Sequence, residues 1–164
     1  MSSDRIEKQV VLKAPLDRVW RAVSNAKEFG QWFGVRFDGP FVAGETVTGT
    51  MVPTTVDSGV AEQQQPYAGM SDTWQIVDVN EPRRLAFRWH PYGGDPDFDY
   101  SQKPTTLVEF TLSETPDGVL LRIVESGFDA LPADRRATAF EANSGGWAIQ
   151  VELVQKYLAL TEPV

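Results

Sequence analysis

The sequence predicts an α+β domain in which a curved antiparallel sheet of about six to seven strands wraps around one long C-terminal α-helix. Three observations support this prediction. A helical pattern fills residues 131–160, two short helical patterns follow the first strand, and strand patterns separated by turn residues fill much of the rest. With 164 residues, 41% of them hydrophobic and 23% charged, the chain is expected to be a single domain spanning residues 1–164.

The opening segment is predicted to be a strand followed by a helix. Ile6, Val10 and Leu12 alternate with polar residues over 5–13, a pattern typical of a strand with one wet face. Pro15 follows this strand. Proline suits the first turn of a helix, because an N–H at that position has no partner within the helix.

A second short helix is predicted where Asn25 and Glu28 have the spacing of a capping box. It carries three aromatic side chains, Phe29, Trp32 and Phe33. An element this short cannot bury all three rings within itself. The rings are therefore expected either to pack in the core of the domain or to line the mouth of a pocket.

The middle of the chain alternates between strand patterns and turn residues. Strands are predicted at residues 35–37, 45–51, 73–79, 85–90, 105–112 and 119–125. Residues 53–70 and 91–104 show little periodicity. We expect both segments to be long loops, either of which could gate a cavity.

The predicted C-terminal helix has one apolar face and an unusual pair of glycines. The face consists of residues at steps of four and three, namely Phe140, Ser144, Trp147, Val151, Val154 and Leu158. Gly145 and Gly146 lie in the middle of the helix, where each glycine costs roughly 1 kcal/mol against alanine. Either a neighbouring strand or ring packs closely against them, or the helix is thinned above a ligand chamber.

Composition argues against several classes of function. The chain has no cysteine, so it has no disulfide framework, thiolate nucleophile or cysteine metal site. A net charge of −8 and a pI near 4.6 argue against a nucleic-acid partner, because phosphate binding needs clustered cations. We expect a cytoplasmic protein without membrane insertion, because no signal-peptide core and no membrane-length apolar run occurs.

Sequence motifs for cofactors and metals are missing or incomplete. Neither a phosphate loop nor a Gly-x-Gly-x-x-Gly fingerprint is present, so no cofactor is expected. Asp95, Asp97 and Asp99 resemble the start of a calcium loop. However, Tyr100 stands where such a loop needs glycine, and Thr106 stands where it needs glutamate. We therefore expect no metal site.

Glu125 is the carboxylate that the pattern places best for chemistry. It shares the register of Leu121 and Ile123, so it should point toward the core, where an enclosed carboxyl is a candidate acid or base. Alternatively, it is a strand-end glutamate that reaches solvent. His90 is the one histidine, and because it precedes Pro91 at a strand end we interpret it as a surface or structural residue.

Five short segments carry a family resemblance over nearly the whole chain. They are residues 14–20 (Ala-Pro-Leu-Asp-Arg-Val-Trp), 32–33 (Trp-Phe), 78–85 (Asp-Val-Asn-Glu-Pro-Arg-Arg-Leu), 125–128 (Glu-Ser-Gly-Phe) and 146–147 (Gly-Trp). Together they resemble the START-like superfamily, also called SRPBCC or helix-grip, and more narrowly its branch related to the Hsp90 ATPase activators. The resemblance implies a deep, mostly apolar cavity between the sheet and the long helix.

The resemblance also implies a class of function. Members of the superfamily bind lipids, polyketides, hormones or other hydrophobic small molecules, and some are cyclases or hydratases. Our first hypothesis is that this chain binds a hydrophobic or aromatic small molecule in the implied cavity. The residues expected to form this site are Trp32, Phe33, Trp74, Trp89, Phe110, Glu125, Phe140, Trp147 and Val151.

Two other hypotheses remain open. One is a cofactor-independent cyclase or hydratase that uses Glu125 together with Tyr157 or His90. The other is a protein-interaction role, through a chaperone or through a homodimer. Eukaryotic Hsp90 activators carry a separate N-terminal domain that contributes to chaperone binding. This chain has no room for such a domain, which argues against an Hsp90 partner.

Overall fold

The computed structural model describes residues 4–91 and 104–161. Its strands are β1 (Arg5–Leu12), β2 (Val35–Phe37), β3 (Thr46–Met51), β4 (Ser71–Asn80), β5 (Arg84–Trp89), β6 (Thr106–Thr115) and β7 (Gly118–Ser126). Its helices are α1 (Leu16–Ser24), α2 (Ala26–Phe33), α3 (Ser58–Gln64) and α4 (Ala133–Thr161). Two short 3-10 segments complete the list, η1 (Gln65–Tyr67) and η2 (Phe128–Ala130).

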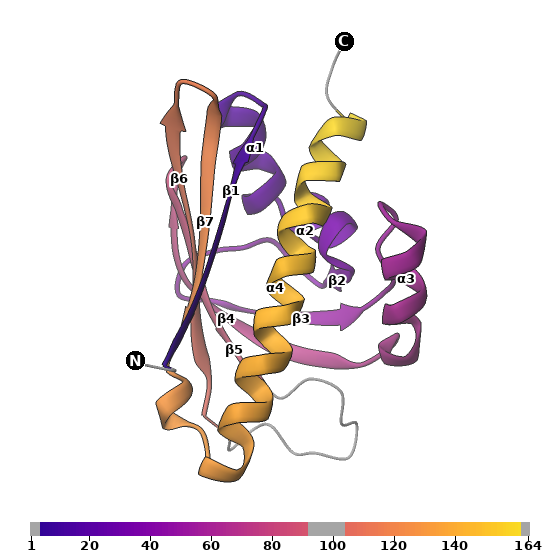
Figure 1. The fold of residues 1–164 in the computed structure, drawn as a ribbon, viewed down its shortest axis with the longest axis vertical. Coiled ribbons are helices and arrows are strands. Elements are labelled where there is room, and N and C mark those ends of the chain that lie inside the picture. The colour runs from indigo at the N-terminus through magenta and orange to yellow at the C-terminus, as the bar shows by residue number, and fades with distance from the viewer. Residues whose placement is uncertain (1–3, 92–103, 162–164) are drawn as a thin grey trace.

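The seven strands of the described residues form one antiparallel sheet, in the order β1-β7-β6-β5-β4-β3-β2. Figure 1 shows α4 running along the open face of this curved sheet, with α1 and α2 near its C-terminal half and α3 to one side. The predicted α+β fold, with a terminal helix gripped by a curved antiparallel sheet, is therefore confirmed.

Local signals set the start and the end of α2. The side chain of Asn25 accepts a 3.0 Å hydrogen bond from the backbone N–H of Glu28, as the capping-box spacing predicts. Gly34 ends the helix with a φ of 97°, a left-handed conformation that glycine adopts without a steric penalty. The last residue of the helix, Phe33, places its ring centroid 5.9 Å from that of Trp147 on α4.

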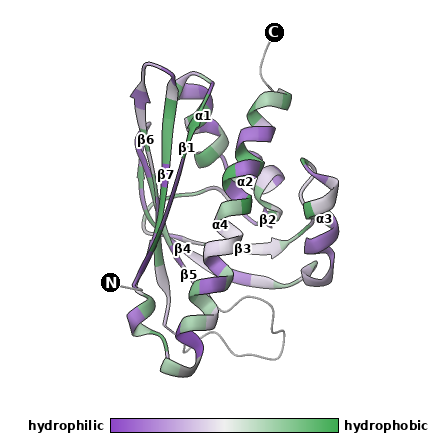
Figure 2. Ribbon diagram, viewed as in Figure 1, coloured by the Kyte–Doolittle hydropathy of each residue, from purple (hydrophilic) through white to green (hydrophobic). Residues whose placement is uncertain are grey.

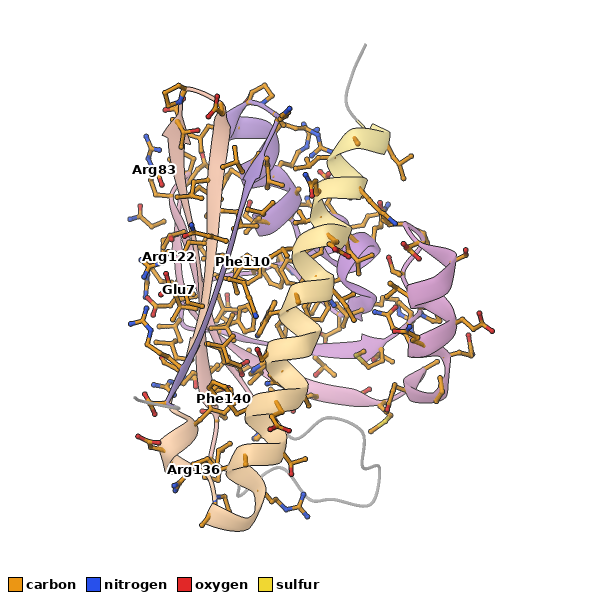
Figure 3. All side chains as sticks on the ribbon, viewed as in Figure 1. Glu7, Arg83, Phe110, Arg122, Arg136 and Phe140 are labelled. Atoms are coloured by element: carbon orange, nitrogen blue, oxygen red, sulfur yellow. The ribbon has the colours of Figure 1, made fainter. Side chains whose placement is uncertain are left out.

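The core fills the space between the sheet and the helices. Inward-pointing residues of β5, β6 and β7 are at most 3% exposed, and they include Leu85, Phe87, Val108, Phe110, Leu112, Leu121 and Ile123. Figure 3 shows Phe110 between the sheet and α4, whereas Glu7 and Arg122 lie on the outer side. The latter two form an ion pair of 2.7 Å. The alternation of inner apolar and outer polar residues is typical of a sheet with one solvated face.

The prediction of a long loop over residues 53–70 is wrong, because α3 and η1 occupy its centre. The Asp57 side chain caps α3 by accepting bonds of 2.9 and 3.1 Å from backbone N–H groups of the first turn. Gln64 then donates a 3.1 Å bond to the backbone oxygen of Phe33. In Figure 2, α3 is mostly white and purple, so the helix lacks the apolar stripe by which an amphipathic helix is predicted from a sequence.

Neither explanation for the glycine pair of α4 finds support among the described residues. A methyl group built at Gly145 or Gly146 would meet no described atom within 4 Å, apart from chain neighbours and the helix's own backbone. No described strand or ring therefore packs closely against the pair. Neither glycine lines the cavity described below, so the pair does not thin the helix above it either.

The second predicted loop, residues 91–104, lies outside the described residues apart from its two ends. Within the described ranges, no helix combines the length and apolar character that crossing a lipid bilayer requires.

Candidate functional site

A cavity of about 370 Å³ lies between α4, the end of α2 and the inner face of β3, β4 and β5. Its apolar wall includes Phe33, Val35, Met51, Met70, Trp74 and Trp89. Its polar wall includes Ser71, Asp72, His90, Asn143 and Gln150. The volume, the aromatic wall and the few polar groups are typical of a pocket for a small organic molecule.

Three of the predicted site residues line this cavity, namely Phe33, Trp74 and Trp89. Their ring centroids lie 5.0 Å apart for the Trp74–Trp89 pair, 5.7 Å for Phe33–Trp74 and 6.1 Å for Phe33–Trp89. The planes of each pair meet at 62° to 80°, so the rings pack edge to face. They form one continuous aromatic wall, contributed by α2, β4 and β5.

Three other predicted site residues belong to the filled core instead. Trp32 is fully buried and donates its indole N–H to the backbone oxygen of Ala22 at 2.9 Å. Phe110 and Trp147 are also buried, with ring centroids 5.7 Å apart. Strand alternation placed Phe110 on the inner face correctly, but neighbouring side chains separate all three rings from the cavity.

Phe140 and Val151 do not border the cavity either. The Phe140 ring packs against Phe128 of η2, with centroids 5.2 Å apart. Val151 is partly buried against the core. Both were predicted from the apolar face of α4, but this face is longer than the cavity that it covers.

Glu125 is fully buried and accepts hydrogen bonds from four side chains. The indole N–H groups of Trp89 and Trp147 donate to it at 2.7 and 2.9 Å. Asn143 donates to both carboxylate oxygens at 3.0 and 3.1 Å, and the Thr106 hydroxyl donates to one of them. The carboxylate therefore joins β5, β6 and β7 to α4, and its inward orientation agrees with the register predicted from the sequence.

The bonding of Glu125 indicates a positioning role. A carboxylate offers about four acceptor positions, and five donor contacts reach these two oxygens. Two of the donors, Trp89 and Asn143, line the cavity. Glu125 thus holds part of the cavity wall in place, and no acceptor position remains for a substrate proton in this arrangement.

His90 lines the cavity together with Asp72, and its two hydrogen bonds to Asp72 fit the structural one of the two predicted alternatives, not the surface one. The His90 side chain is only 14% exposed, and its Nδ1 lies 2.7 Å from Asp72 Oδ1. The backbone N–H of His90 donates to the other Asp72 oxygen at 3.1 Å. The two residues join the ends of β4 and β5 at the cavity. Asp72 precedes Trp74 by two positions on β4, so strand alternation could have indicated its inward side.

Tyr157 lies too far from Glu125 to act with it. Its hydroxyl donates a 2.7 Å hydrogen bond to Glu28. It follows Trp147, which contacts Glu125, by ten residues on α4, a rise of roughly 15 Å. Burial raises the pKa of Tyr157 above its ordinary value, and the bond to Glu28 raises it further.

Asn143 and Gln150 are cavity residues that sequence analysis missed. With Trp147 they follow a spacing of four and three along α4, so helical periodicity contained the signal. The prediction included only the apolar face of α4, so it left out these two polar residues. Met70 gave no comparable signal, because it is the last residue of the segment that was predicted to be a loop.

A second hollow, of about 660 Å³, lies outside α2, between this helix and β2. Exposed side chains such as Lys27, Gln31, Arg36 and Asp38 line it. A hollow bordered by solvated side chains is a surface groove, so it offers a ligand less enclosure than the cavity beneath α4.

Among residues 4–91 and 104–161, no group of three or more His, Asp or Glu side chains is arranged to hold a metal ion. The calcium-loop resemblance at residues 95–99 lies outside the described residues.

Comparisons with known proteins give a family and a fold. The family model described as "Activator of Hsp90 ATPase homolog 1-like protein" matches residues 13–159. No curated protein matches the chain. Among solved structures, protein MLL2253 from Mesorhizobium loti is similar with a TM-score of 0.70 and 21% identity, over 97% of this chain and 99% of that one.

Two further structures share the fold. Protein Ms6760 from Mycobacterium smegmatis has a TM-score of 0.70 and 17% identity, over 98% of this chain and 94% of its own. DynU16, a protein in the dynemicin biosynthetic locus, has a TM-score of 0.67 and 23% identity. The match covers 98% of this chain but 49% of DynU16, so this chain spans about half of that protein.

The family match covers nearly all of the sheet and most of α4, including Glu125 and the three rings of the aromatic wall. The solved structures agree with it in fold. The chain belongs to the Activator of Hsp90 ATPase homolog 1-like family, within the START-like superfamily.

Proposed function

We propose that this protein binds a small hydrophobic or aromatic molecule in the cavity beneath α4. The observation that carries the proposal is the aromatic wall formed by Phe33, Trp74 and Trp89 beside about 370 Å³ of space. Such a wall gains free energy by removing apolar ligand surface from water, at about 25 cal/mol per Å². The fold similarity to DynU16, a protein in a biosynthetic locus, is compatible with a small organic ligand.

The alternative hypotheses receive less support. A cyclase or hydratase that uses Glu125 would need a carboxylate oxygen within hydrogen-bond reach of the substrate, but uncharged protein donors already occupy both oxygens. A protein-interaction role would be supported by a contiguous exposed apolar patch. The large exposed hydrophobic residues of the described ranges lie on different elements: Val11, Val42, Tyr67, Val77 and Leu160. A homodimer stays a prediction.

Ligand binding can be tested with two matched variants of α4. Ala142 and Ala148 are both exposed, but only Ala142 lines the cavity. The wild type and each Ala→Trp variant would be screened by thermal unfolding against a panel of lipids and aromatic compounds. A compound at about 100 times its Kd should raise the Tm of the wild type by roughly 5–10 °C.

Ala142→Trp places a large ring at the cavity and should abolish the Tm increase, whereas Ala148→Trp should keep it. If no compound stabilises the wild type, or if both variants respond as the wild type does, the proposed function is wrong.

A further inference from the structure

The three rings of the aromatic wall are each backed by a deeper ring. Phe33 stacks on Phe29, with centroids 5.0 Å apart, and Trp74 stacks on Phe87 at 4.5 Å. In both pairs the planes meet at only 23°. Trp89 lies against Trp147 at 5.5 Å and 31°. Phe33 and Trp74 are only 5% and 3% exposed, so Trp89, which is half-buried, offers the most ring surface to the cavity.

Ring faces carry negative electrostatic potential, so an aromatic wall can bind a positive charge as well as an apolar surface. Tryptophan is the best side chain for this interaction, and two of the three rings of the aromatic wall are tryptophans. The edge-to-face arrangement of these rings lets one ligand group touch more than one of them.

A carboxylate lies directly behind the wall. Glu125 accepts the indole N–H of Trp89 at 2.7 Å and has only uncharged hydrogen-bond partners among the described residues. No arginine or lysine among the described residues bonds to it, so the group behind Trp89 brings no positive charge to this side of the cavity.

The charged side chains that border the cavity are negative rather than positive. Asp72 is a lining carboxylate, and no lysine or arginine stands among the described lining residues. Gln150 also lines the cavity, and its side-chain oxygen is buried without a hydrogen-bond partner among the described residues. This oxygen is an acceptor that a ligand N–H could satisfy. The whole chain carries a net charge of −8, which favours the approach of cations over that of anions.

The geometry points to an organic cation as the preferred ligand, with an ammonium group attached to an aromatic or apolar body. This inference rests on the proposed function and names the chemical class of its ligand. The ammonium group lies against Trp89, near Asp72, while the body fills the space beside Val35, Met51 and Met70. An anion of the same shape is disfavoured, because no positively charged side chain of the described wall contacts it.

Two probes of nearly the same shape test the preference for charge. Phenyltrimethylammonium is a cation, and tert-butylbenzene replaces its nitrogen by carbon and is neutral. Binding of each probe would be measured by quenching of tryptophan fluorescence, at about pH 8, where free imidazole is uncharged. We expect the cation to bind at least about tenfold more tightly than the neutral probe, and the difference to shrink as salt is added.

An Asp72→Asn variant tests the role of the lining carboxylate, because asparagine keeps an oxygen for His90 and removes the charge. It should weaken binding of the cation about fivefold and leave binding of the neutral probe unchanged. Asp117→Asn is the matched control, since Asp117 is exposed in the turn between β6 and β7, away from the cavity. It should change neither affinity.

The outcomes separate this inference from the proposed function. Equal or tighter binding of the neutral probe would overturn the preference for cations while leaving the binding function intact. An equal loss of cation affinity in both variants would also overturn it, because the effect would then come from net charge alone. Binding of neither probe, together with no response in the ligand panel, would overturn both proposals.

Discussion

Two glutamates join α4 to the rest of the molecule, and they are held in opposite ways. Glu28 on α2 lies 2.9 Å from Arg18 and 2.8 Å from Arg21, and it also accepts the Tyr157 hydroxyl. Its side chain is 19% exposed. Glu125, which contacts the middle of α4, is fully buried, and among the described residues only uncharged groups donate to it.

The difference distinguishes contacts that only hold the fold together from contacts that also shape the cavity. At Glu28 two arginines neutralise the charge near the surface, and the cluster ties α1, α2 and α4 together. At Glu125 no described arginine or lysine contacts the carboxyl group, and burial of such a polar group is tolerated only when its donors are in place. Two of these donors, Trp89 and Asn143, form part of the cavity wall, so the same bonds that make burial possible also fix the shape of the site.

The largest expected effect comes from removing the carboxylate of Glu125. Glu125→Ala leaves two indole N–H groups, a hydroxyl and an amide buried without their acceptor. We expect the free energy of unfolding to fall by about 3–5 kcal/mol. Urea denaturation followed by circular dichroism measures the change. Glu125→Gln, which keeps one oxygen, should lose less than the alanine variant, and a loss below about 1 kcal/mol for alanine would refute the positioning role.

A smaller and pH-dependent effect is expected at Glu28. Burial raises the pKa of this carboxyl, but the Tyr157 hydroxyl and the charges of Arg18 and Arg21 outweigh it, so the net pKa lies below its ordinary value of 4.5. A lowered pKa means that the ionised form stabilises the fold. This contribution is complete above pH 4.5 and is lost as the pH falls through the lower pKa of the folded state.

Glu28→Gln should therefore reduce the free energy of unfolding by about 1–3 kcal/mol at neutral pH. The gap to the wild type should close in acid. Urea denaturation over a pH series measures it, with Glu62→Gln as a control, because Glu62 is an exposed glutamate of α3. A gap that stays constant with pH would show that the charge of Glu28 does not stabilise the fold.

The smallest expected effect has the opposite sign. Gly145 and Gly146 lie on α4 between Asn143 and Trp147, two of the residues that bind Glu125. Because an added methyl group meets no atom within 4 Å, either glycine→alanine change should raise the free energy of unfolding by about 0.5–1 kcal/mol. Thermal and urea unfolding both measure the gain. A loss of stability would contradict this prediction. It would mean that α4 needs the backbone flexibility of the two glycines, and not only the bonds to Glu125, to adopt its position.

Sequence periodicity predicted most of the fold because most elements carry their own signal. The strands alternate, α2 has its capping residue Asn25, and α4 has a continuous apolar face. Helix α3 was missed because its stability comes from distant contacts. Its cap Asp57 forms an ion pair with Lys156 of α4, and Gln64 bonds to the end of α2. Neither contact can be read from neighbouring residues.

The candidate site was predictable in part for the same reason. Alternation places Trp74, Trp89 and Phe110 on one face of the sheet, but it does not say how far the cavity extends along that face. The path of α4 decides this, and it leaves Phe110 in the filled core. The register of Glu125 predicted its burial, whereas its donors come from three elements far apart in the sequence and could not be predicted.

The order of the strands in the sheet has a consequence for folding during synthesis of the chain. β1 is the first strand in the sequence, yet its one partner in the sheet is β7, so Leu12 pairs with Val119. More than a hundred residues separate the two strands. A ribosome adds roughly 5–20 residues per second, so β1 is without its partner for about 5–20 s after its synthesis. Non-local strand pairing is also slow in itself, because the intervening loop must close first. The charged residues of β1, namely Arg5, Glu7 and Lys8, disfavour pairing of this unpaired strand with other chains until β7 is made.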